Sequence, residues 1–254
     1  MNSPQEPDQS FPILHREDTR ERDACALICA VRKGGQATHG NVKRTIEALA
    51  RMGHRTGIVD GEGDGVGIMT DIPRQLWAKT LALKGLRSSL ASDASFWVAH
   101  LMIPAARRED EAALVEAVCQ RIAAAGLQIY IEQPGKVDRR VLGRAAERNE
   151  PGFWQIAGTN GRVALDELES TIFRVQDRIE REMGVHFPSF SSRSVVYKVQ
   201  GTVEILRRYY PELRDPEYAS TVTLGHARYS TNTNPIFERT RRFPPDAAGP
   251  GQAP

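Results

Sequence analysis

The sequence predicts an α/β or α+β fold, in which helices pack around a mixed or antiparallel sheet. Short apolar runs typical of strands alternate with stretches of helical periodicity, and no regular repeat is present. The predicted strands are residues 24–31, 68–72, 96–103, 127–132, 194–199 and 219–224. The 254 residues suffice for one large domain or two small ones with a substantial core.

Apolar residues at helical spacing predict three helices. Their apolar positions are Val42, Ile46, Leu49 and Ala50; Val115, Val118, Cys119 and Ile122; and Leu168, Ile172, Val175 and Ile179. We also expect a short helix through Leu76 and Trp77, which Pro73 is suited to start, and a helix near residues 202–209. Gly126 is suited to the end of the helix that contains Val115. The first strand, residues 24–31, is apolar on both faces, so we expect both faces to be buried.

A glycine-rich run, Gly61 to Gly67, has the appearance of a phosphate-binding loop. A dinucleotide-binding fingerprint, however, needs a strand before it and a helix after it. Here a helix precedes the run and a strand follows it, so we expect a turn that lets two backbone segments approach closely.

Composition narrows the class of protein. A net charge of +2 does not favour nucleic-acid binding. The longest apolar stretch, residues 96–106, is shorter than the roughly 20 residues that span a bilayer. Three cysteines and an N-terminus without an apolar core indicate a reducing compartment, the cytoplasm. We expect a polar leader over 1–24, a folded domain over 25–243 and a disordered tail over 244–254.

Cys25 is the candidate nucleophile, although a cysteine in a buried strand is often only a small apolar side chain. If the leader is removed after Ala24, Cys25 carries a free α-amine, whose reference pKa is roughly 7.7–8.0. Such an amine can take the thiol proton and return it to a leaving ammonia. Cys29 would lie roughly 13 Å away on a strand, too far to share a metal or a disulfide. No metal site is therefore predicted.

Arg228 begins a polar run just after a predicted strand, and its planar guanidinium matches a carboxylate in a bidentate manner. Tyr229 and Thr231 add hydrogen-bonding groups. Two other interpretations remain open. The run can be an ordinary surface loop, or His226 can be the base of a cysteine protease.

Together these stretches resemble the class-II glutamine amidotransferase domain of glutamate synthases. The likeness covers residues 21–240. It rests on Glu21-Arg22-Asp23-Ala24-Cys25, on His54-Arg55 followed by Gly63 to Ile68, on Ser191 to Lys198, and on His226 to Thr233. These stretches correspond to a processing site, to HRG and GDGAGI elements, to an SSRTIVYKG strand and to HSRFSTNT.

The resemblance implies an α+β fold of N-terminal nucleophile hydrolases, a four-layer αββα sandwich, here incomplete. It implies that Cys25 attacks the amide of L-glutamine, that Arg228 holds the α-carboxylate, that Tyr229 and Thr231 line the pocket, and that Arg55 lies near the nucleophile. Ammonia would pass to a glutamate synthase core domain or subunit, which adds it to 2-oxoglutarate with FMN and an iron–sulfur cluster. No cofactor is expected in this chain.

The sequence also departs from the family pattern. Ala26 and Thr56 stand where the family has glycine, and Gln133-Pro134 interrupts a region usually written R-x-V-P. The chain ends before the HNGEIN element of the oxyanion hole and before a later aspartate that binds the substrate ammonium. We therefore expect an N-terminal fragment, a truncated product or one piece of a split enzyme, with weak or no glutaminase activity. The alternative is a non-catalytic glutamine-binding or regulatory module.

Overall fold

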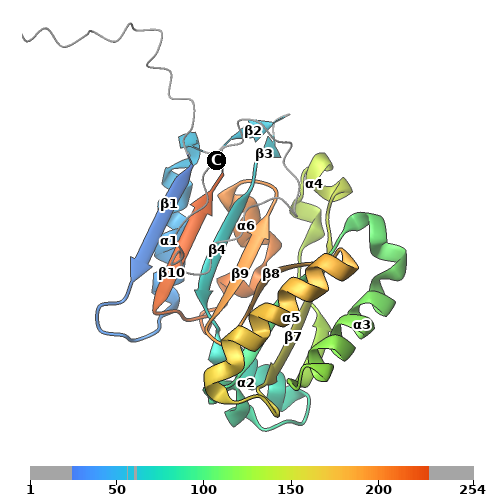
Figure 1. Ribbon diagram of the computed structural model, residues 1–254. Helices are drawn as coiled ribbons and strands as arrows, with labels where there is room; N and C mark the ends of the chain where they lie inside the picture. Colours follow the sequence, from blue (N-terminus) through green and yellow to red (C-terminus); the bar gives the residue numbers. More distant parts are fainter. Residues whose placement is uncertain (1–24, 56, 60–61, 229–254) are drawn as a thin grey trace, which may run out of the picture.

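The computed structural model of this chain describes residues 25–55, 57–59 and 62–228. Its strands are β1 (Ala26–Val31), β2 (Ile58–Val59), β3 (Glu62–Gly63), β4 (Val66–Asp71), β5 (Trp97–Ile103), β6 (Gln128–Pro134), β7 (Gly152–Thr159), β8 (His186–Ser191), β9 (Ser194–Val199) and β10 (Val222–Ala227). They form two four-stranded sheets, of order β1-β10-β4-β9 and β6-β7-β5-β8, and a hairpin of β2 with β3. The strand pairs of both sheets are antiparallel, so the predicted α+β class is confirmed (Figure 1).

The α-helices are α1 (His39–Arg51), α2 (Arg74–Leu83), α3 (Glu111–Ala124), α4 (Arg144–Arg148), α5 (Leu168–Met183) and α6 (Val203–Tyr209). Short 3₁₀ turns are η1 (Gly53–Arg55), η2 (Ser88–Ser92), η3 (Ala105–Asp110), η4 (Arg139–Val141), η5 (Leu165–Glu167) and η6 (Pro211–Arg214). Within the described ranges, no helix has the length and apolar character needed to cross a membrane.

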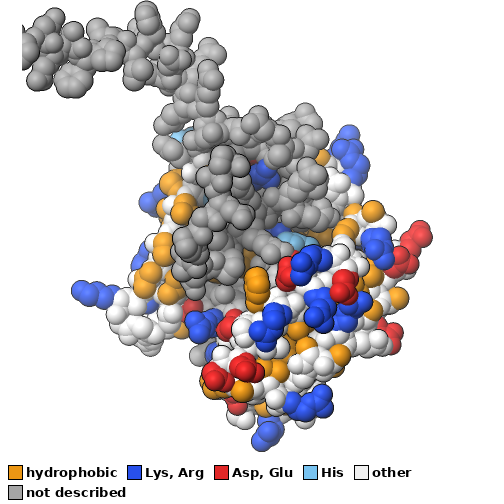
Figure 2. Space-filling view, viewed as in Figure 1, with side chains coloured by type: hydrophobic (Ala, Val, Ile, Leu, Met, Phe, Trp, Pro, Cys, Tyr) orange, Lys and Arg blue, Asp and Glu red, His pale blue; other side chains and the backbone are white. Residues whose placement is uncertain are grey.

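Helices cover one face of each sheet. In Figure 1, α1 and α6 lie behind the first sheet, whereas α3 and α5 lie in front of the second. A β-carbon built at Gly225 of β10 would lie 2.4 Å from Leu49 Cδ1 of α1, so β10 and α1 are in close contact at this glycine. Exposed Lys and Arg side chains gather over α5 (Figure 2).

Two apolar clusters form the core. The first joins α1, α6 and the first sheet to one face of the second sheet, with Leu49, Ile68 and Tyr197 among its buried members. The second fills the space between the other face of β5 and β7 and helices α3 and α5, around Trp97 and Ile172. The predicted helical periodicity therefore faces the core in α1, α3 and α5.

The prediction that the first strand is buried on both faces is wrong. Leu27 is 62% exposed and Val31 is 64% exposed, whereas Ala26 is buried. The strand is at the edge of its sheet, and only its other face meets α1. An apolar run shows that a segment favours a strand, but it does not show whether other parts of the described chain cover both faces.

Candidate active site

The four strands of the first sheet begin or finish at a common end of the sheet. This end brings together residues that are far apart in the sequence. Ala26 of β1 pairs with Ala227 of β10, which in turn pairs with Val66 of β4, and Val66 pairs with Val199 of β9. One residue further along each strand, the same register aligns Cys25, Arg228, Gly65 and Gln200 in a row across the sheet. Cys25 and Arg228 are therefore direct neighbours in this row.

Alternation along the strands assigns this row to the face opposite α1. Gly225 faces α1 and pairs with Ile28 and Ile68. Cys25 and Arg228 are each three residues away from a member of that row, so their side chains belong to the other face. Cys25 is exposed and Arg228 is half-buried.

The backbone of Arg228 is held on both sides by the glycine-rich segment. Its N–H donates to the carbonyl oxygen of Gly65 at 2.9 Å, and its carbonyl oxygen accepts from the N–H of Gly57 at 3.0 Å. The N–H of Asp64 in turn donates to the carbonyl oxygen of Gly57 at 2.8 Å. These bonds fix the position of Arg228 independently of its side chain.

The same segment is bonded to α4 and packs against the residues that precede α6. The Glu62 carboxylate accepts from the backbone N–H groups of Ala145 and Ala146 at 3.0 and 3.2 Å, at the start of α4. Gly63 packs directly on backbone, because a β-carbon there would lie 2.4 Å from the carbonyl carbon of Gly201. The expectation that this glycine run allows a close backbone approach is confirmed.

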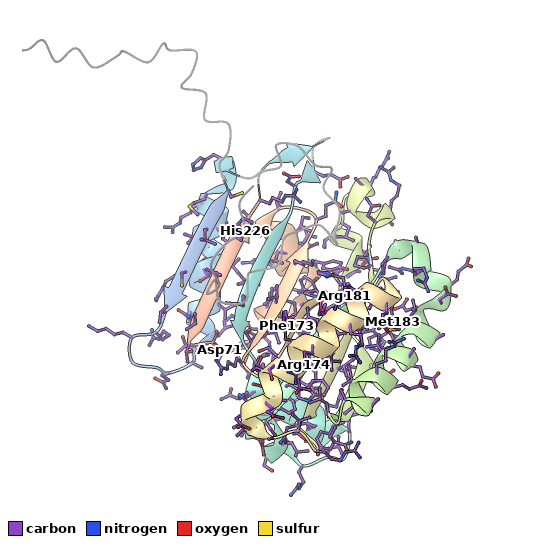
Figure 3. The ribbon with its side chains drawn as sticks, viewed as in Figure 1. Asp71, Phe173, Arg174, Arg181, Met183 and His226 are labelled. Carbon is purple, nitrogen blue, oxygen red and sulfur yellow. The ribbon has the colours of Figure 1, made fainter. Side chains whose placement is uncertain are left out.

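A second row on this face consists of Leu27, His226, Gly67 and Lys198. His226 is thus a diagonal neighbour of Cys25, roughly 7–8 Å away by ordinary sheet geometry. Figure 3 shows His226 and Asp71 toward opposite ends of this sheet. The register is therefore compatible with His226 as a base as well as with a free α-amine on Cys25.

Lys198 is buried and connects this row to the second sheet. Its Nζ lies 2.6 Å from Nε2 of His186 on β8, and Nδ1 of His186 lies 3.1 Å from Oε1 of Glu180 on α5. The Lys198 side chain is therefore anchored to β8, and Glu180 lies on the other side of the His186 imidazole.

The other predicted site residues are only partly described. Arg55 is the last residue of η1 and lies two residues before Gly57, whose N–H donates to Arg228. The backbone of Arg55 is therefore close to the same end of the sheet as Arg228. Tyr229 and Thr231 lie outside the described residues, as do the predicted leader over 1–24 and the tail over 244–254. The structure thus aligns Cys25 with Arg228, and the roles of Arg55, Tyr229 and Thr231 stay predictions.

A cavity of about 900 Å³ opens elsewhere, between α3 and β6, and Cys119 lines it. The Cys119 thiol donates to a Glu132 carboxylate oxygen at 3.3 Å. Burial, followed by this hydrogen bond, raises the pKa of the thiol to about 12, so it stays protonated at neutral pH. Cys119 is therefore not a reactive nucleophile. The end of the first sheet that carries Cys25 and Arg228 is the better candidate site.

The sequence did not single out Gln200, which ends the row at β9 and is 3% exposed. A lone glutamine after a strand carries no motif, and its place beside the candidate site follows only from the pairing of β9 with β4. Gly65 was predicted only as part of a turn, and Gly57 was not singled out. Their hydrogen bonds to Arg228 could not be assigned without the register.

Comparison with known proteins matches residues 25–244 to the family of class-II glutamine amidotransferases. A "Ferredoxin-dependent glutamate synthase 2" of Synechocystis is 33% identical over 220 residues, which cover 85% of this chain and 14% of that protein. The "Ferredoxin-dependent glutamate synthase" of Pyropia yezoensis is 30% identical, with the same coverage. The "Glutamate synthase [NADPH] large chain" of Azospirillum brasilense is 29% identical, over 88% of this chain and 15% of that protein. The chain thus spans about one seventh of the length of these relatives.

Proposed function

The chain belongs to the class-II glutamine amidotransferases, and we propose that its Cys25 releases ammonia from the side-chain amide of L-glutamine. The Cys25 sulfur forms a bond to the amide carbon, and the carbon–nitrogen bond breaks as ammonia leaves. Water then hydrolyses the resulting thioester to give glutamate and regenerate the thiol. A free α-amine on Cys25 accepts the thiol proton and donates it to the leaving nitrogen.

The alignment of Cys25 with Arg228 in one row of the sheet is the observation that carries this proposal. Directly opposite residues of an antiparallel pair have β-carbons roughly 4.5–5.5 Å apart. One end of a small amino acid can therefore contact the guanidinium while its side-chain amide reaches the sulfur. Arg228 would bind the α-carboxylate through two parallel hydrogen bonds.

Arg55, Tyr229 and Thr231 complete the proposed site. Tyr229 and Thr231 lie one and three positions after Arg228 in the sequence. Arg55 precedes the segment that holds the Arg228 backbone. We assign Arg55 to the surroundings of the nucleophile, and Tyr229 and Thr231 to the wall of the glutamine pocket.

The relatives support a proposal for the fate of the ammonia. Their names describe glutamate synthases that use ferredoxin or NADPH, and this chain matches only a small share of each. We therefore assign the ammonia to a glutamate synthase core domain or subunit, which adds it to 2-oxoglutarate with FMN and an iron–sulfur cluster. The cofactors belong to that partner, and the reaction would take place in the cytoplasm.

Covalent labelling with a glutamine-like diazoketone tests the proposal. Cys29 is a matched control, because it is also exposed and lies on the same face of the same strand. The native protein and Cys29→Ala should gain one adduct, Cys25→Ala should gain none, and L-glutamine should slow the labelling. Glutamine binding without labelling would support the non-catalytic module instead, and absence of both would overturn the assignment.

The α-amine has its own test. Intact-mass measurement of the purified protein should show a chain that starts at Cys25. Efficient labelling of a chain that retains residues 1–24 would exclude the amine as the base. It would favour His226, the diagonal neighbour of Cys25.

A further inference from the structure

We propose that the side-chain carbonyl of Gln200 binds the α-ammonium group of the substrate amino acid, which adds a recognition group to the proposed glutamine site. The inference rests on the proposed function. It starts from the environment of Gln200. This residue belongs to none of the family motifs, and the role of Cys25 as nucleophile does not account for it.

Gln200 is a polar side chain with an incomplete set of contacts. It is 3% exposed, and its Oε1 atom is buried without a hydrogen-bond partner in the described part of the chain. A buried carbonyl without a partner loses its hydration and gains nothing in return, so native proteins rarely leave one unpaired. A ligand that donates a hydrogen bond would remove this penalty.

The position of Gln200 relates it to Arg228. Both belong to the row at this end of the sheet, Gln200 directly after β9 and Arg228 directly after β10, with Gly65 between them. Two strand spacings separate their backbones by roughly 10 Å. Gly65 and, in the next row, Gly67 carry no side chains, so this strand places no side chain between Arg228 and Gln200 on this face.

The chemistry of the two side chains is complementary to the two charges of an amino acid. The guanidinium of Arg228 has only donors, so it suits a carboxylate. An ammonium group also has only donors, and the Gln200 oxygen is an acceptor without a partner. Lys198, on the same strand and face, is directed to His186 Nε2 at 2.6 Å. The amine of Lys198, two residues before Gln200, therefore has a partner of its own.

Ligand binding by a chain that cannot turn over provides the test. In a Cys25→Ala background, L-glutamine and 4-carbamoylbutanoate, the same molecule without its α-amino group, are titrated by calorimetry. Gln200→Met, which keeps the length of the side chain, should weaken L-glutamine binding by roughly 10- to 100-fold, as expected for a hydrogen bond to a charged group. It should leave the affinity for 4-carbamoylbutanoate unchanged.

A second variant separates recognition from structure. Gln200→Glu retains an acceptor and adds a negative charge, so it should preserve or increase the preference for L-glutamine over the analogue. Equal losses for both ligands in the two variants would show that Gln200 has a structural role, or pairs with a buried water, and would overturn the inference. If the Cys25→Ala protein with Gln200 intact does not bind L-glutamine, the proposed function fails and this inference fails with it.

Discussion

The backbone N–H of Arg228 donates a 2.9 Å hydrogen bond to the carbonyl oxygen of Gly65, so the candidate carboxylate-binding residue is anchored by the glycine-rich segment. The bond joins the end of β10 to the start of β4 and continues the ladder of the sheet by one residue. Because it involves only backbone atoms, the position of Arg228 depends on the conformation of the segment from Gly57 to Gly65 more than on any side chain within it.

Replacement of Gly63 by alanine should therefore disturb both stability and reactivity. The new β-carbon would lie within 2.4–2.6 Å of backbone atoms of Gly201 and Thr202, which cannot move aside as a side chain can. We expect Gly63→Ala to lower the free energy of unfolding by about 1–3 kcal/mol and to slow labelling of Cys25. Gly53→Ala is the control, because nothing lies within 4 Å of its β-carbon position. Equal urea midpoints for the two variants would contradict the prediction.

Arg228→Lys should separate binding from stability. Lysine keeps the positive charge but loses the planar fork, so the affinity for L-glutamine should fall roughly tenfold or more, about 1.4 kcal/mol. The backbone bonds to Gly57 and Gly65 remain, and stability should change by less than about 0.5 kcal/mol. Calorimetric titration measures the affinity and urea denaturation measures the stability, each beside Arg51→Lys, an exposed change in α1. Unaltered affinity in Arg228→Lys would remove this residue from the site.

Much of the fold could be predicted from the sequence, because local patterns were strong. The alternating apolar segment 194–199 is β9, and the helical face of Val42, Ile46 and Leu49 is that of α1. The strand predicted over 219–224 is observed at Val222–Ala227, so its start was placed three residues too early. The preceding residues instead bridge to other elements, since Ser220 pairs with Thr38.

Two strands of the second four-stranded sheet were missed for identifiable reasons. In β8, Pro188 interrupts the segment, and proline argues against a strand in the interior of a sheet. This strand is at the edge of its sheet, where proline is tolerated. The strand β7 (Gly152–Thr159) begins and nearly ends with glycine, which weakens its pattern. Gly158 is nevertheless required, because a β-carbon there would lie 1.8 Å from the carbonyl oxygen of Gln128.

The candidate site was predicted in part. Motifs identified Cys25 and Arg228, although 203 positions separate them in the sequence. Gln200 and the backbone anchors of Arg228 could not be predicted, because their proximity is a property of strand register, which pairs β9 with β4 and β4 with β10.

Asn41 should be a sensitive point for the strand that precedes the site. It is 1% exposed, and its Nδ2 donates to Ala30 O at 3.0 Å, Thr221 O at 3.2 Å and Thr223 Oγ1 at 3.2 Å, so it joins α1 to β1 and β10. Asn41→Asp keeps the shape but replaces the donor by a carboxylate oxygen that faces two carbonyl oxygens. We expect a loss of about 2–4 kcal/mol.

Chemical denaturation of Asn41→Asp, beside the exposed change Glu47→Gln in the same helix, measures this loss. Hydrogen exchange in β1 should accelerate more than exchange in β5, because β5 belongs to the other sheet. A stability equal to that of Glu47→Gln would show that the three hydrogen bonds contribute little.

His100 should make stability depend on pH below neutrality. It is fully buried between Phe153 and Tyr197, and its Nδ1 lies 2.9 Å from Val196 O. Burial lowers its pKa to about 4, with the hydrogen bond to Val196 opposing the shift. The unfolded chain, whose histidine pKa is roughly 6.5, therefore binds more protons between pH 6.5 and 4, and stability falls as pH falls through this window, by up to about 3 kcal/mol at pH 4.

His100→Asn removes this contribution while retaining a donor for Val196 O. The variant should be less stable at pH 7 because it leaves space in the core, and its deficit relative to the native protein should shrink as pH falls from 7 to 4. Burial raises the pKa of Glu212 and acts in the opposite direction, but Glu212 is present in both proteins, so the difference isolates His100. Urea denaturation at several pH values measures the deficit, and His54→Asn, at an exposed position, should show no such trend. A constant deficit for His100→Asn would mean that His100 does not titrate on unfolding in this range.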